Sequence, residues 1–91
     1  MFAVSGRVTG SRGTPVSGVT LTFSRVSGGG DVPFSVQTDD NGNWNQTGFE
    51  PGTTYRVTPS KIRTSFAPSF LDFSAQMTTL NFATVGRGIS N

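Results

Sequence analysis

The chain has 91 residues, of which 33% are hydrophobic and 13% charged, and its formal net charge is +2. This length allows one domain around a single core, because chains divide into several domains only above about 250 residues. Cysteine and histidine are both absent, which excludes a disulfide scaffold, a thiolate metal site and a histidine general base.

Residue types that favour strands dominate the chain, since Thr, Val and Ser greatly outnumber Ala, Leu, Glu and Lys. Apolar and polar side chains also alternate, most regularly at Val19, Leu21 and Phe23, which is typical of a half-buried strand. In chain order we expect strands at residues 2–9, 19–24 and 32–38, a short one from Trp44, one at 55–58 that Pro59 ends, and two more at 71–73 and 80–84. This pattern predicts an all-β fold, a seven-stranded antiparallel Greek-key β-sandwich. We expect a single domain over residues 1–86, followed by a flexible tail at residues 87–91.

Turn-forming residues separate the predicted strands. Asn41 and Gly42 lie between the third and fourth strands and predict a tight hairpin. Pro51 and Gly52 fit a type II turn, because Pro fixes φ at its first central position and Gly accepts a positive φ at the second. The glycine run at residues 28–30 predicts a flexible loop tip between the second and third strands.

Most aromatic side chains are expected inside the sandwich. By their position in the alternation, the predicted core members are Phe23, Phe34, Phe49, Tyr55, Phe73 and Phe82. Trp44 allows two interpretations. It forms an exposed platform with Phe66 and Phe70, on which a sugar ring or a partner protein stacks, or it closes the open end of the sandwich, which we favour.

Residues 39–43 carry side-chain oxygens at alternate positions, as calcium-binding loops do. The closing Glu of such a loop is missing, so a hairpin turn is the better interpretation and we expect no metal site. Four of the five carboxylates lie in predicted turns or loops, and Asp72 should point outward from its strand. We therefore expect no catalytic residues, no cofactor and no enzymatic activity.

The basic residues give no sign of a nucleic-acid site. They are spread along the whole chain, whereas proteins that bind duplexes usually concentrate them on one face. No apolar run approaches the roughly 20 residues of a membrane-spanning helix. We expect neither a nucleic acid nor a membrane as partner.

Four segments in one order carry a resemblance to a known family: Val4–Val8, Gly13–Leu21, Thr38–Trp44 and Phe49–Tyr55. This order resembles the carboxypeptidase regulatory-like domains, over roughly residues 4–84. The resemblance implies a prealbumin-like (transthyretin-like) sandwich of the Ig-like kind and a non-catalytic module, with the Cna B-type repeats of bacterial surface proteins as relatives. Two features depart from the family pattern: Gln46 replaces a large apolar residue, and the loop at residues 25–32 is rich in glycine.

Some Cna B-type relatives form an isopeptide bond from a lysine on the first strand. The first strand here carries Arg7, and the single lysine, Lys61, follows the fifth strand in a predicted loop. A protonated guanidinium is a poor nucleophile, and the reaction needs a positioned, deprotonated lysine. We therefore expect no such crosslink.

Three functions remain open. The first is an accessory module of an exported or surface protein that provides spacing and contacts with proteins or glycans; the others are a self-contained subunit of a virion or filament, which forms homo-oligomers, and a carbohydrate-binding domain. The candidate partner-contact residues are Trp44, Phe66, Phe70, Arg7 and Arg56. The segment Met1–Val4 lacks the features of a signal peptide, so we expect either a domain excised from an extracellular or surface protein, or a chain made in the cytoplasm and assembled into a particle.

Overall fold

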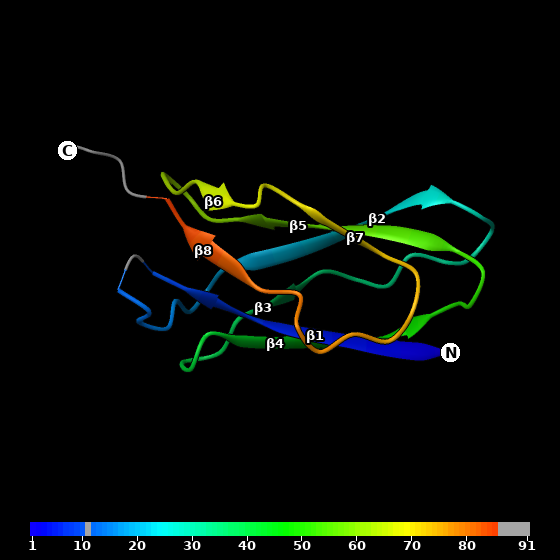
Figure 1. The fold of residues 1–91 in the computed structure, drawn as a ribbon, viewed down its shortest axis with the longest axis horizontal. Helices are drawn as coiled ribbons and strands as arrows, with labels where there is room; N and C mark the ends of the chain where they lie inside the picture. Colours follow the sequence, from blue (N-terminus) through cyan, green and yellow to red (C-terminus); the bar gives the residue numbers. More distant parts are fainter. Residues whose placement is uncertain (11, 86–91) are drawn as a thin grey trace.

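Two four-stranded sheets face each other in the computed structural model, which describes residues 1–10 and 12–85 (Figure 1). The first sheet has the order β4–β1–β8–β6, with β1 at Phe2–Thr9, β4 at Asn43–Phe49, β6 at Phe66–Ala67 and β8 at Phe82–Thr84. The second has the order β3–β2–β5–β7, with β2 at Thr20–Ser27, β3 at Val36–Gln37, β5 at Thr54–Ser60 and β7 at Leu71–Phe73. The predicted all-β sandwich is confirmed. The predicted tail lies outside the described residues.

The strand count and one strand direction differ from the prediction. There are eight strands in the described part of the chain, because the short β6 forms before β7. β1 and β8 pair in parallel, whereas we expected only antiparallel pairs. After β7 the chain rounds the end of the sandwich and then runs beside β1 in the same direction (Figure 1). A connection that changes sheets in this way brings a parallel strand next to the first one.

Alternation along β1 and β2 places their apolar residues inside the sandwich, as predicted. The buried apolar core consists of Val4, Val8, Val19, Leu21, Phe23, Trp44, Phe49, Tyr55, Val57, Phe73, Leu80 and Phe82. Phe49 lies at its aromatic centre: the ring centroids of Tyr55, Phe73 and Phe23 are 4.9, 5.0 and 5.1 Å from that of Phe49. These edge-to-face contacts join β4 of one sheet to three strands of the other.

A bulge in β4 lets Trp44 and Phe49 both point inward, although they are five positions apart and would lie on opposite faces of a regular strand. The register with β1 shifts between the pairs Phe2–Phe49 and Val4–Gln46, so β4 holds one extra residue there. Gly48 adopts a φ of 94° within this shift. Glycine takes that conformation without the strain that a Cβ causes, and bulges commonly use it.

The predicted third strand is mostly a loop. Only Val36 and Gln37 pair with β2, and Phe34 is 88% exposed, so its placement in the core was wrong. The segment before β3 leaves the sheet and crosses to β4, where the Gln46 side chain donates a hydrogen bond to the Phe34 carbonyl. Residues 32–35 therefore have no neighbouring strand that would give their alternation an inner face.

Pro59 does not end the fifth strand, which continues to Ser60. Pro59 is opposite Leu21 of β2, but β7 pairs with β5 only at residues 55–57. Beyond Val57 one side of β5 has no strand partner, and a residue without an N–H is tolerated at such a position. The expected seventh strand is also shorter, because Leu80 precedes β8.

The segment before β8 passes so close to β1 that residue 6 has to be a glycine. The Ser5 amide donates to the Met77 carbonyl at 2.9 Å, and the Leu80 amide donates to the Ser5 carbonyl at 3.1 Å. A Cβ on Gly6 would overlap the carbonyl oxygen of Leu80 and lie 2.9 Å from the indole nitrogen of Trp44. Only glycine leaves space for the segment before β8 at this distance.

The Tyr55 hydroxyl ties the glycine-rich loop to the next turn. It accepts a hydrogen bond from the Glu50 amide at 2.9 Å and donates one to the Asp31 carbonyl at 3.0 Å. The Thr53 hydroxyl accepts from the Gly30 amide at 2.9 Å. The loop is therefore anchored at Gly30 and Asp31, while nothing lies within 4 Å of the position of a Cβ on Gly29.

Candidate interaction surfaces

Trp44 is buried rather than displayed on the surface. Its side chain is 2% exposed, its ring centroid lies 5.8 Å from that of Phe23, and its indole N–H has no hydrogen-bond partner among the described residues. The exposed platform of Trp44 with Phe66 and Phe70 is therefore not formed. Trp44 is part of the buried core, where it packs against Phe23.

Arg56 and Phe70 lie together on the outer face of the second sheet. The guanidinium carbon of Arg56 is 3.9 Å from the centroid of the Phe70 ring, a distance typical of a cation–π contact. Arg56 also holds Asp72 of β7 with two hydrogen bonds of 2.8 and 3.2 Å. Arg56 and Asp72 meet because the register of the two strands pairs them directly across β5 and β7. We call these three residues the Arg56 cluster.

The ion pair shifts the titration of both partners. The hydrogen bond that Asp72 accepts from Arg56 is the main cause that lowers the pKa of the Asp72 carboxyl below its ordinary value of 3.8. Desolvation of the carboxylate opposes this shift, and the positive charge of Arg56 adds to it. The same hydrogen bond raises the pKa of Arg56. Both side chains are 38% exposed, so solvent screens their attraction and the pair contributes little to stability.

We expect a small acid-dependent loss of stability from this pair. A lowered carboxyl pKa adds stability that is complete above the ordinary pKa and disappears as the pH falls through the folded-state pKa. Denaturant unfolding at several pH values should therefore show that Asp72→Asn differs from the wild type at neutral pH, and that the difference shrinks on acidification. In Arg56→Gln, NMR titration should find the Asp72 pKa returned toward its ordinary value. An unchanged Asp72 pKa in that variant would contradict the assignment.

The other two predicted contact residues lie elsewhere. Phe66 is half-buried in β6 and packs against the core. Arg7 lies on β1 of the first sheet, and its side chain donates a hydrogen bond to the Asn41 carbonyl at 3.1 Å. The structure thus brings Arg56 and Phe70 together, and leaves Phe66 and Arg7 apart from them.

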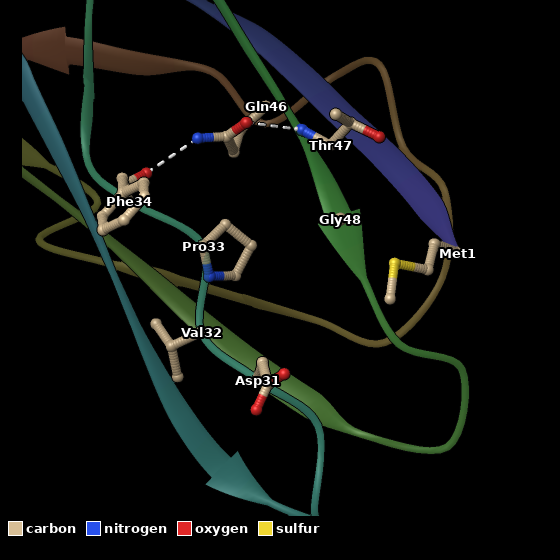
Figure 2. Close-up of a pocket in the computed structure, with 8 residues that line it drawn as sticks. All are labelled: Met1, Asp31, Val32, Pro33, Phe34, Gln46, Thr47 and Gly48. Carbon is tan, nitrogen blue, oxygen red and sulfur yellow. Dashed lines mark hydrogen bonds between the residues drawn. The ribbon is translucent and has the colours of Figure 1, made fainter.

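An apolar groove that our sequence analysis missed lies between β4 and the segment before β3. Figure 2 shows its lining, which consists of Met1, Asp31, Val32, Pro33, Phe34, Gln46, Thr47 and Gly48. Its volume is about 340 Å³, and Met1 and Phe34 on its rim are 81% and 88% exposed. The useful sequence signal was Pro33, because a proline within an expected strand suggests that the chain leaves the sheet there.

Gln46 closes the groove at one side by joining two backbone segments. Its side-chain amide donates to the Phe34 carbonyl at 2.8 Å, and its side-chain oxygen accepts from the Thr47 amide at 2.8 Å (Figure 2). The Thr47 amide belongs to the free side of β4, which is an edge strand. Gln46 therefore occupies a backbone donor that another strand would otherwise use. A large apolar residue at this position makes neither bond.

Replacing Gln46 with alanine should therefore destabilise the fold and expose this edge. We expect a loss of about 1–2 kcal/mol in the free energy of unfolding, because two backbone groups lose their partners. Light scattering at high concentration should also show more self-association than in the wild type. Gln76→Ala is the matched control, since Gln76 is exposed and outside these bonds, and should change neither quantity. Equal stability of the two variants would contradict the role given to Gln46.

Residues 39–43 form a tight turn, but the predicted hairpin is wrong, because β3 and β4 belong to different sheets and do not pair. The Asp39 carboxylate accepts hydrogen bonds from the Asn41 and Asn43 amides at 2.9 and 3.0 Å, and the Gly42 amide donates to the Asp39 carbonyl at 2.9 Å. Within the described residues, no group of three or more acidic side chains is arranged to hold a metal ion. Lys61, the single lysine, donates to the Ser17 carbonyl at 2.9 Å on the surface. No helix in the described part is long and apolar enough to cross a membrane.

Comparison with protein families gives a match over most of the chain. The model of the carboxypeptidase regulatory-like domain matches residues 3–83, which is nearly the whole chain. The matched range begins in β1 and ends in β8, so it includes both sheets. Comparisons with curated proteins and with solved structures give no significant match.

Proposed function

Because the chain belongs to the carboxypeptidase regulatory-like domain family, we propose that it is a spacer module of an exported or surface protein, which holds neighbouring parts apart and contacts other proteins. The family consists of non-catalytic β-sandwich modules, and the chemistry of the described residues agrees with that role. Asp39 closes a turn and Asp72 forms an ion pair, and no three acidic side chains of the described residues are grouped to hold a metal ion.

The position of the two chain ends is the observation that carries this proposal. The N-terminus lies toward one end of the long axis, and β8, the last described strand, runs toward the other end (Figure 1). The reason is the parallel pairing of β1 and β8. β1 runs from one end of the long axis toward the other, and β8 runs in the same direction beside the last residues of β1. A module of this geometry adds its own length to whatever chain precedes and follows it.

The edges of the two sheets favour a module over a self-assembling subunit. Among the described strands, the edge strands β3, β6 and β7 have only two or three residues each. The longer edge strand β4 is capped at Thr47 by Gln46. Short or blocked edges are how soluble β-proteins avoid pairing with copies of themselves.

The apolar groove supports the contact role. Phe34 and Met1 leave apolar surface in water beside a concave lining, and such surface usually marks a place where another protein binds. The carbohydrate alternative depended on an exposed Trp44 and loses that basis. We place the module outside the cell or at its surface, with protein partners and without cofactor or nucleic acid.

Solution scattering tests the proposal. The full chain should remain a monomer by light scattering at high concentration. Two copies joined in series should have a maximum dimension, by small-angle X-ray scattering, close to twice that of one copy. Stable oligomers of the single chain would support the alternative of a virion or filament subunit. A tandem protein no longer than one copy would contradict the spacer role.

A further inference from the structure

The first and last described strands form a direct connection between the two ends of the chain. The segment that leads into β8 runs beside β1 over nearly all of the length of β1, from the bridge between Val4 and Met77 to the pair between Thr9 and Ala83. Both segments run in the same direction (Figure 1). We call the end of the pair where β1 starts the entry end, and the end where β8 stops the exit end.

Several hydrogen bonds connect the two segments along this length. At the entry side, Ser5 bonds Met77 and Leu80 through its backbone amide and carbonyl. In the middle, the side-chain oxygen of Asn81 accepts from the Arg7 amide at 2.9 Å. At the exit side, β1 and β8 form a regular parallel ladder at Val8–Phe82 and Thr9–Ala83.

The direction of these strands determines how they meet a pulling force. Tension on the two chain ends draws β1 toward the entry end and β8 toward the exit end, so the two slide against each other. The bonds between them lie across this direction and are loaded together. If the two terminal strands were antiparallel, both chain termini would lie at the same end of the pair. Tension would then separate the strands from that end, and the bonds between them would break one after another.

We propose that this pair is a mechanical clamp, which gives the domain a second function as a load-bearing element when tension passes through its two ends. The core strengthens the clamp from inside. Val4 and Val8 of β1, together with Leu80 and Phe82, are at most 2% exposed. Sliding of the strands would expose these side chains to water while it breaks the bonds above them.

Single-molecule force measurement tests the clamp by a change of pulling direction. Because the chain has no cysteine, a new one gives a unique attachment point. One arrangement applies force at the N- and C-terminal ends. The other applies it at the N-terminal end and at Gln76→Cys, an exposed position just before the bridge to Val4, and so peels β1 from its starting end. We expect a clearly higher unfolding force in the first arrangement. Equal or lower force there would overturn the proposal.

A pair of asparagine variants tests the bonds themselves. At a fixed end-to-end force, Asn81→Ala should unfold about fivefold faster than the wild type, because it removes one bond of the clamp. Asn45→Ala is the matched control on β4, next to β1 but outside the clamp, and should leave the rate unchanged. An Asn81→Ala rate equal to that of the wild type would contradict the assignment.

This inference rests on the spacer role proposed above, yet the two fail separately. A monomer whose tandem form is extended, but which unfolds as easily through its ends as by peeling, keeps the spacer role and loses the clamp. A chain that oligomerises but resists end-to-end force keeps the clamp and loses the spacer role.

Discussion

Replacing Phe49 with alanine should lower the free energy of unfolding by about 3–5 kcal/mol, the range typical of removing a fully buried phenylalanine. Phe49 has no exposed surface, and its ring contacts those of Tyr55, Phe73 and Phe23. Loss of the ring leaves a cavity where the two sheets meet. Since each kcal/mol lowers Tm by about 4–8 °C in a domain of this size, thermal unfolding should show a fall of at least about 12 °C.

Phe34→Ala is the matched control for Phe49→Ala. The substitution is the same, but Phe34 is 88% exposed, so its removal should change the free energy of unfolding by less than about 0.5 kcal/mol. Urea denaturation of both variants gives the comparison directly. Similar losses in the two would mean that Phe34 belongs to the core after all. A mild effect of Phe49→Ala would contradict its central position.

Gly6→Ala should be nearly as damaging, although it adds only one methyl group. The new Cβ would overlap the carbonyl oxygen of Leu80, so the segment before β8 has to move away from β1. We expect a loss of about 3 kcal/mol, at the upper end of the usual cost of overpacking. The displacement should also break the two backbone bonds of Ser5, and hydrogen exchange at the Ser5 and Leu80 amides should become faster.

Gly29→Ala provides the control for this glycine effect. A Cβ at Gly29 meets nothing within 4 Å, so the substitution should be neutral or should stabilise by up to about 1 kcal/mol through the unfolded chain. If Gly6→Ala is as well tolerated as Gly29→Ala, the close passage of the chain over β1 is wrong.

Alternation predicted the inner faces wherever a strand has neighbours along its length. Val4 and Val8 in β1, and Leu21 and Phe23 in β2, are buried as expected. The same pattern failed at Phe34, because alternation describes a side chain relative to a sheet and this segment has left the sheet. A pattern of period two cannot report where pairing stops.

The bulge in β4 is a second feature that a strict alternation conceals. Trp44 and Phe49 have opposite parity and both are buried, which requires one extra residue between them. Gly48 was the available signal, since an isolated glycine within a strand often marks a bulge. Its position alone does not say on which side of the strand the extra residue lies.

Contacts between distant segments limited the prediction of the candidate surfaces. Arg56 and Phe70 were named from the sequence, and Asp72 was expected to point outward. Their meeting depends on the register of β5 with β7, which no local pattern specifies. Gln46 stood out as a departure from the family pattern, but its two bonds become apparent only once the path of residues 31–35 past β4 is known.

The anchored glycine loop makes this domain a suitable scaffold for displaying foreign peptides. Gly30 and Asp31 are fixed by Thr53 and Tyr55, so the fold does not depend on what stands at Gly29. Longer inserts at an exposed loop cost little additional closure entropy, about 0.6 kcal/mol for each doubling of loop length. An epitope or affinity tag grafted there would be presented in solvent on a thiol-free carrier, and its own conformation would be constrained only at its two ends.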